Sequence, residues 1–165
     1  MRLRPVDVTD VRALLAITSE GMEGYREFAG PDWQPPSFDE LDTVAIDAVA
    51  TWILAEEDGE PVGHTLLIPA SRSREPVDDP SLGHLMQLFV RPSHWGSGVA
   101  ATLNQAIVAA AGERGFEEVR LFTPEAHHRA RRFYEREGWR EVGRMGETPL
   151  GFPVVEYRVR CPTQS

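Results

Sequence analysis

Apolar residues along the chain recur at two spacings, one typical of helices and one typical of strands. They follow near-helical spacing from residue 11 to about residue 28 and again over residues 99–113. Gly21 and Gly24 weaken the second half of the first segment, so we expect a break there. Residues 126–137 predict another helix, ended by Gly138, and the capping-box pair Ser37 and Glu40 predicts one more.

Short apolar segments separated by turn residues predict the strands. The sequence Glu57-Asp58-Gly59 predicts a hairpin, and the polar, proline-containing residues 69–81 predict a surface loop. Strands alternate with helices and then close on a final pair of strands, which is typical of a mixed α/β domain. We expect a single domain over residues 1–165, with strands at residues 2–6, 51–55, 61–68, 84–90, 118–122, 139–144 and 154–159.

Composition places this domain among globular proteins and narrows its chemistry. Hydrophobic residues make up 41% and charged residues 26% of 165 residues. Because there is no apolar run of eighteen residues and no signal-peptide pattern, we expect a cytoplasmic protein with no membrane partner. The single Cys161 excludes an intrachain disulfide, and the spacing of the five histidines predicts no metal site.

The charge of −9 argues against a nucleic-acid partner. Residues 1–90 carry 17 acidic side chains and 6 arginines, a balance of −11, whereas residues 91–165 carry a balance of +2. An acidic first half suits a cationic acceptor and a basic second half suits a polyphosphate donor, although many of these charges simply solvate the surface. All 17 basic residues are arginine, which excludes a Schiff-base or Walker-type lysine.

A glycine turn, Trp95-Gly96-Ser97-Gly98-Val99-Ala100, follows the expected strand 84–90 and opens a helix. Glycine lets the backbone tighten, and the first N–H groups of a helix have no partner within it, so the turn suits a pyrophosphate. Alone, the pattern also fits a structural turn. A dinucleotide site is disfavoured, because the turn lies past the midpoint of the chain and position 120 is Arg, where that site needs an acidic residue.

A second motif lies about thirty residues later, in the segment His127-His128-Arg129-Ala130-Arg131-Arg132-Phe133-Tyr134-Glu135-Arg136-Glu137-Gly138-Trp139. Together, the two motifs resemble those of the GNAT superfamily of N-acetyltransferases, Q/R-x-x-G-x-G/A and N-x-x-A-x-x-F-Y-x-x-x-G-F, over roughly residues 1–160. The resemblance implies an α/β fold of α+β type, the GNAT fold. This has a mixed, mostly antiparallel sheet of about seven strands flanked by about four helices. It also implies acetyl-CoA as co-substrate. Trp95 stands where the family has Gln or Arg, and His127 where Asn is common.

The resemblance assigns residues to the donor site. It places Tyr134 near the coenzyme sulfur, as proton donor to the leaving thiolate. Acyl transfer also requires a backbone N–H for the tetrahedral oxyanion, and we expect a splayed strand end near Leu88 to supply it. The side chains of Arg129, Arg131 and Arg132 either reach the phosphates of the donor or pair with glutamates of the same helix. The residues it implies for acetyl-CoA binding are Leu88, Phe89, Val90, Trp95, Gly96, Ser97, Gly98, Val99, Ala100, His127, Ala130, Arg132 and Phe133.

The base and the acceptor site are less defined. His84 is the first candidate for the base, since an ordinary histidine pKa near 6.5 suits proton removal at neutral pH, with a hydrogen-bonded strand histidine as the alternative. Glu20 and Glu23 are further candidates in the region that lines the acceptor site in this family. Tyr25 and Trp33, with Trp52, form either a cage for a cation or part of the core.

We therefore expect direct transfer of an acetyl group from acetyl-CoA to a primary amine of a small molecule, in a ternary complex. Two alternatives stay open at this point. One is an acyl-CoA-binding sensor without turnover, and the other is an acetyltransferase acting on protein N-termini or lysines. The resemblance also leaves a homodimer open.

Overall fold

The computed structural model describes residues 1–34, 49–146 and 151–163. One sheet of seven strands organises them, in the order β1-β2-β3-β4-β5-β7-β6. Every neighbouring pair is antiparallel except β4 and β5, which are parallel. The predicted mixed, mostly antiparallel sheet is thus confirmed. Its strands are β1 (Arg2–Pro5), β2 (Thr51–Glu57), β3 (Glu60–Pro69), β4 (Leu82–Val90), β5 (Glu118–Pro124), β6 (Arg140–Met145) and β7 (Val154–Arg160).

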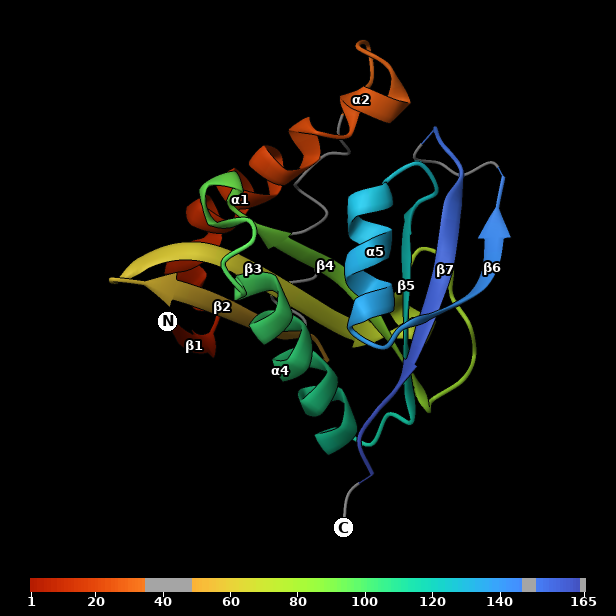
Figure 1. Cartoon of the computed structure of the whole chain (residues 1–165). Helices are drawn as coiled ribbons and strands as arrows, with labels where there is room; N and C mark the ends of the chain where they lie inside the picture. Colours follow the sequence, from red (N-terminus) through yellow and green to blue (C-terminus); the bar gives the residue numbers. More distant parts are fainter. Residues whose placement is uncertain (35–48, 147–150, 164–165) are drawn as a thin grey trace.

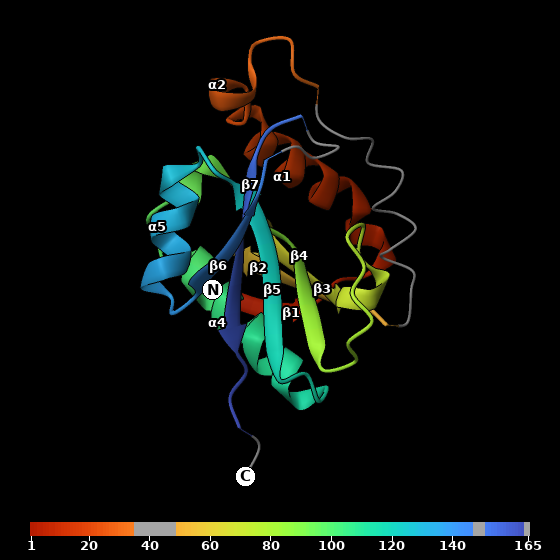
Figure 2. The ribbon, with the colours of Figure 1, turned by 90° about the vertical axis from the view of Figure 1, so that its right-hand side faces the viewer.

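Helices cover both faces of this sheet. Figures 1 and 2 show α4 and α5 on one face and α1 on the other. The break expected in the first helix is present, since α1 ends before Gly24 and the short α2 follows. The helix predicted from Ser37 lies outside the described residues. The described helices are α1 (Val11–Glu23), α2 (Arg26–Ala29), α4 (Val99–Glu113) and α5 (His128–Arg136).

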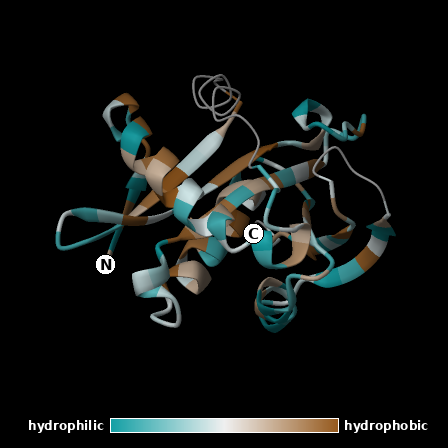
Figure 3. Ribbon diagram, turned by 90° about the horizontal axis from the view of Figure 1, so that it is seen from above, coloured by the Kyte–Doolittle hydropathy of each residue, from teal (hydrophilic) through white to brown (hydrophobic). Residues whose placement is uncertain are grey.

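The main core lies between the sheet and α4. Leu103 and Ile107 of α4 are fully buried, one helical turn apart. Ile107 packs in a cluster with Leu67 and Leu121, and Leu103 in a second cluster with strand residues such as Val62. In Figure 3 the central strands carry much of the hydrophobic colour, while arginine-rich α5 is largely hydrophilic. The single buried indole of this core, Trp139, donates its N–H to Asn104 Oδ1 at 3.0 Å, which satisfies both groups.

A buried histidine fastens α1 to the opposite face. Trp52 Nε1 donates to His64 Nδ1 at 3.0 Å, so the ring proton sits on Nε2, which lies 2.9 Å from the Thr18 hydroxyl. Burial lowers the pKa of His64 to about 3 and keeps it neutral. Trp52 therefore packs in this network and is not brought to Tyr25.

The described ranges, residues 1–34, 49–146 and 151–163, bear on the expected partners. No helix there combines the length and apolarity needed to cross a bilayer. No group of three or more histidine, cysteine, aspartate or glutamate side chains there is arranged to hold a metal ion. The absence of a metal, the cytoplasmic location and a homodimer stay predictions.

Candidate active site

The two parallel strands at the centre of the sheet separate after a short pairing. β4 pairs with β5 only over residues 82–84, opposite residues 118–120. Met86 is an extra residue in β4, because Leu85 and Gln87 face the consecutive residues Leu67 and Leu66 of β3. β5 pairs along its whole length with β7 instead. The edge of β4 beyond His84 therefore faces an opening in the sheet.

The peptide groups of β4 that face this opening can be identified. Arg91 N–H donates to Val62 O of β3 at 2.8 Å. Since peptide groups alternate between the two edges of a strand, those of Leu88 and Val90 point the other way. The Val90 carbonyl accepts the indole N–H of Trp95 at 2.9 Å. The N–H and C=O of Leu88 are left to face the opening.

The glycine turn lies at the end of this same edge. Its second glycine, Gly98, is the N-cap of α4 and provides no side-chain cap. The first helical hydrogen bond runs from Thr102 N–H to Gly98 O at 3.1 Å, so the amides of Val99, Ala100 and Ala101 have no partner within the helix. Gly96 and Gly98 have φ of 80° and 92°, and a Cβ at either would meet open space. The turn therefore presents free N–H groups to a ligand at the positive end of the helix dipole.

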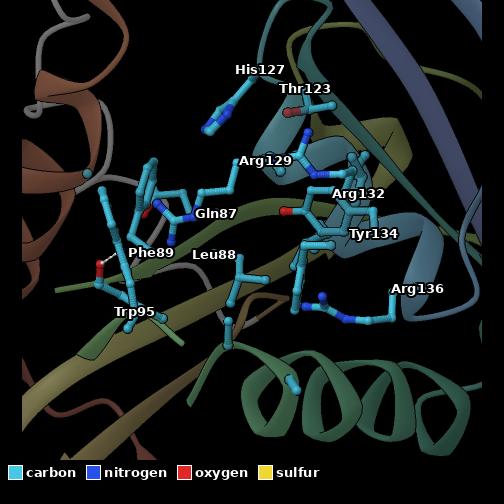
Figure 4. Close-up of a pocket in the computed structure, with 18 of the residues that line it drawn as sticks. Gln87, Leu88, Phe89, Trp95, Thr123, His127, Arg129, Arg132, Tyr134 and Arg136 are labelled. Atoms are coloured by element: carbon cyan, nitrogen blue, oxygen red, sulfur yellow. Dashed lines mark hydrogen bonds between the residues drawn. The ribbon is translucent and has the colours of Figure 1, made fainter. Parts of the chain in front are cut away.

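A cavity of about 690 Å³ joins the opening to the turn and continues along α5 (Figure 4). Its volume is ordinary for a small-molecule site. The structure brings to it most of the residues that the sequence proposed, namely Tyr25, Leu88, Phe89, Val90, Trp95, Gly96, Gly98, Ala100, His127, Ala130, Arg132, Phe133 and Tyr134. Two residues of the turn do not line it by their side chains. Val99 is buried in the core, and the Ser97 hydroxyl donates to His94 O.

Tyr134 reaches the cavity from α5. Its ring packs edge-on against Phe133 and Trp139, with centroids at 5.2 and 5.7 Å. Its hydroxyl forms no hydrogen bond with any described residue. Burial raises the pKa of the phenol well above its ordinary value, and the phenol of Tyr25, which lines the same cavity, raises it further. Tyr134 is therefore a protonated, unpaired hydroxyl donor at neutral pH.

His84 is not brought to the cavity. Parallel pairing sets it beside Arg120 of β5, whose Nε donates to His84 Nδ1 at 3.2 Å, and its ring packs against Phe122 at 5.5 Å. Burial, and then the charge of Arg120, lowers the pKa of His84 to about 3. The imidazole stays neutral, and the nitrogen that would accept a proton is already engaged. These contacts match the alternative of a hydrogen-bonded strand histidine.

The two glutamates of α1 also lie away from the cavity lining. Glu20 forms an ion pair of 2.7 Å with Arg91, and Glu23 pairs with Arg26 one helical turn on. Both carboxylates are therefore paired with arginines, and neither partner was predicted from the sequence.

The aromatic residues that the sequence assigned to the acceptor site, Tyr25 and Trp33, form a cluster at one end of the cavity. Trp33 does not line the cavity itself but packs on Tyr25, which does, with ring centroids at 5.7 Å. His127 packs edge-on against Tyr25 at the same distance. His127 is the N-cap residue of α5, yet its imidazole forms no capping hydrogen bond, and burial followed by the charge of Arg129 lowers its pKa to about 4.

Among the lining residues to which the sequence did not point are Gln87, Thr123 and Arg136. Gln87 is 6% exposed, and its Oε1 has no hydrogen-bond partner within the described ranges. An amide inside the apolar run LMQLFV was the available signal, since a buried polar side chain needs a partner. The Met86 bulge that places it cannot be predicted from the spacing.

Comparison with known proteins adds independent evidence. Residues 18–139 match the model of the acetyltransferase (GNAT) family. An uncharacterised N-acetyltransferase of Mycobacterium bovis is 32% identical over 91 residues, which are 55% of this chain and 53% of that protein, and one of Mycobacterium tuberculosis gives the same values. The match thus spans about half the length of these relatives.

Solved structures show the same fold. The ribosomal-protein-S18-alanine N-acetyltransferase of Escherichia coli has a TM-score of 0.75 at 14% identity, over 99% of this chain and 96% of that one. The paia N-acetyltransferase of Thermoplasma acidophilum, in complex with coenzyme A, has a TM-score of 0.73 at 13% identity, over 96% and 98%. The family model, the sheet and the two motifs agree, and the chain belongs to the GNAT family of acetyltransferases.

Proposed function

We propose that this protein transfers an acetyl group from acetyl-CoA to a primary amine of a small molecule, by direct attack in a ternary complex. One observation carries the proposal. The free peptide edge at Leu88 runs into the uncapped glycine turn, and the unpaired hydroxyl of Tyr134 lines the same cavity. The glycine turn can bind the donor, the Leu88 edge can polarise the thioester carbonyl, and Tyr134 can donate a proton.

The residues present fit coenzyme A. The free amides of Gly96, Gly98, Val99, Ala100 and Ala101 suit its diphosphate, and the absence of a Cβ at Gly96 and Gly98 leaves open space at the turn. The Leu88 carbonyl suits an amide N–H of the pantetheine arm, with Ala130 and Phe133 of α5 along the cavity wall. When bound, acetyl-CoA supplies an activated acetyl thioester and a thiolate leaving group.

Two groups of the chain would assist the reaction. The Leu88 N–H, on the edge of β4 that lacks a strand partner, would donate to the oxygen on which negative charge develops. Tyr134 would donate its proton to the departing sulfur, and its raised pKa keeps it protonated for that role. Its ring contacts with Phe133 and Trp139 hold the hydroxyl in place.

Removal of the proton from the amine needs no side-chain base in this proposal. Among the described residues that line the cavity there is no carboxylate. Two histidines line it. His94 lies in the loop just before the glycine turn, at the end of the cavity proposed for the diphosphate, and a pKa lowered to about 4 makes the His127 imidazole a weak base. We therefore assign proton removal to water, which the cavity can admit, and we withdraw the base role from His84. The rate should then follow the ionisation of the acceptor amine, with no inflection near pH 6.5.

The aromatic cluster favours an acceptor with an apolar or cationic part next to its amine. Tyr25 and His127 line the cavity, with Trp33 behind Tyr25. Because His127 is neutral at physiological pH, it does not repel a cation from these rings. A small amine can bind at this end of the cavity without the loss of conformational entropy that ordering a peptide acceptor would require.

The experiment has two steps. Calorimetry with coenzyme A tests the donor site, and a thiol-detecting dye then follows acetyl-CoA with a panel of small amines and with peptides that carry free N-termini or lysines. We expect one coenzyme A per chain and amine-dependent thiol release, with the acetylated amine seen by mass spectrometry. Binding without release from any acceptor would favour the sensor, and release only with peptides would favour a protein acetyltransferase.

A further inference from the structure

A guanidinium lies on the indole that precedes the glycine turn. Trp95 is held in place by its N–H, which donates to Val90 O at 2.9 Å. Arg129, the second residue of α5, places its guanidinium carbon 3.6 Å from the centroid of the Trp95 ring. Figure 4 shows the Arg129 side chain extending across the cavity toward Trp95. The contact therefore joins the β4–α4 loop to α5 at the edge of the cavity.

The charge of Arg129 is not neutralised by any carboxylate within the described ranges, and partial burial lowers the pKa of its guanidinium. A stack on an aromatic face positions a cation without cancelling its charge. Arg131, two residues on, is a contrast, since it donates to Glu125 O and Tyr157 Oη and lies 3.6 Å from Glu141. Arg129 is thus held in place with its charge available.

A diphosphate bound in this cavity would need a full positive charge beside it. The free amides of the turn offer only partial positive charge, and position 95, where the family motif has Gln or Arg, is an indole. Arg132 and Arg136 of α5 line the same cavity, so its α5 side carries several cations. A guanidinium that lines the same cavity as the free amides matches a diphosphate, which accepts hydrogen bonds from both.

We infer that Arg129, positioned by the Trp95 ring, binds the diphosphate of the acyl donor and supplies the side-chain contact that position 95 lacks. The inference rests on the proposed function, because it takes coenzyme A as the ligand of this cavity. Trp95 is the positioning residue, and Arg129 is the residue that contacts the ligand. The two residues act as a unit contributed by different elements.

The test is calorimetry with three probes on the intact chain. Coenzyme A carries the diphosphate and a 3′-phosphate, dephospho-coenzyme A keeps only the diphosphate, and pantetheine has neither. Arg129→Ala should weaken coenzyme A and dephospho-coenzyme A equally, by about 10- to 100-fold as for the loss of one charge-assisted hydrogen bond, and leave pantetheine unchanged. Arg12→Ala, which removes an exposed arginine of α1, is the matched control and should leave all three affinities within about twofold.

A rescue variant separates this role from a structural one. Arg129→Ala combined with Trp95→Arg returns a cation to position 95 and should recover coenzyme A affinity to within a few-fold of the original, about half a logarithmic unit. Urea unfolding of each variant checks that the fold is intact.

Several results would overturn the inference. They are an Arg129→Ala chain that binds coenzyme A as tightly as the unmodified chain, a loss seen with coenzyme A but not with dephospho-coenzyme A, and an equal loss with pantetheine. Failure of the unmodified chain to bind coenzyme A would instead refute the proposed function, and the inference with it.

Discussion

A single methyl group on α1 tests how this helix shapes the cavity. A Cβ built at Gly21 would lie 2.4 Å from Phe89 Cδ1. Phe89 has little room to retreat, since its ring also packs against His64, with centroids at 6.0 Å. Gly21 and Phe89 both line the cavity. Gly21→Ala must therefore move either α1 or a wall of the proposed donor site.

The magnitude follows from two opposing contributions. Non-bonded carbon atoms in van der Waals contact lie about 3.5–4.0 Å apart, so α1 or Phe89 must shift by roughly 1 Å to accept the new Cβ. Overpacking of this kind lowers the free energy of unfolding by about 1–3 kcal/mol. Replacing a helical glycine by alanine returns about 1 kcal/mol. Gly24→Ala is the matched control, because its Cβ would meet only Gly21 O at 3.9 Å and its φ of −64° suits alanine. Gly21→Ala should therefore be less stable than Gly24→Ala by about 1–3 kcal/mol.

Urea unfolding of the two variants, compared at equal m-values, measures this difference. Coenzyme A calorimetry on the same samples should show weaker binding for Gly21→Ala and unchanged binding for Gly24→Ala. Equal unfolding midpoints for the two variants would refute the packing of α1 on Phe89.

Three further predictions concern the site and its histidines. Tyr134→Phe should lower kcat by about 10²- to 10⁴-fold in the acetyl-transfer assay, because the proton donor to the sulfur is lost. The unfolding midpoint and the coenzyme A affinity should stay unchanged, because the hydroxyl has no partner in the described residues. A change in kcat below twofold would remove Tyr134 from the mechanism. Gly98→Ala should weaken coenzyme A binding in calorimetry, because a φ of 92° is strained for alanine and the turn that presents the amides would have to change its backbone conformation. Unchanged affinity would place the diphosphate elsewhere. His64 and His84, whose pKa values are lowered to about 3, take up protons in the unfolded chain below pH 6.5 before they do so in the folded chain. The free energy of unfolding should thus fall as pH decreases from 6.5 toward 3, by about 2 kcal/mol per residue at pH 5. His84→Gln should flatten that slope in urea titrations, whereas the exposed His128→Gln should not, and equal slopes for both would contradict the assignment.

Local signals in the sequence predicted much of the fold. The bounds of α4 agree with the prediction because Gly98 and Gly115 mark its ends, and the hairpin follows from Asp58 and Gly59, which both adopt positive φ. The glycine turn was equally local, since its chemistry depends on consecutive residues.

The roles that sequence reasoning misplaced depend on tertiary partners. His84 resembled a base until its neighbour Arg120, 36 residues later, was brought beside it by parallel pairing. Glu20 resembled an acceptor-site acid because its partner Arg91 is 71 residues away. The stack of Arg129 on Trp95 joins two motifs that were recognised separately. No spacing along the chain encodes such pairs.

The position of bound coenzyme A tests the central claim most directly. A crystal structure of the chain grown with coenzyme A should place the diphosphate on the amides of the glycine turn, between Gly96 and Ala101. The pantetheine arm should lie along Leu88, with the sulfur within hydrogen-bonding distance of Tyr134 Oη. Coenzyme A bound outside this cavity, or with its sulfur directed away from Tyr134, would contradict the account.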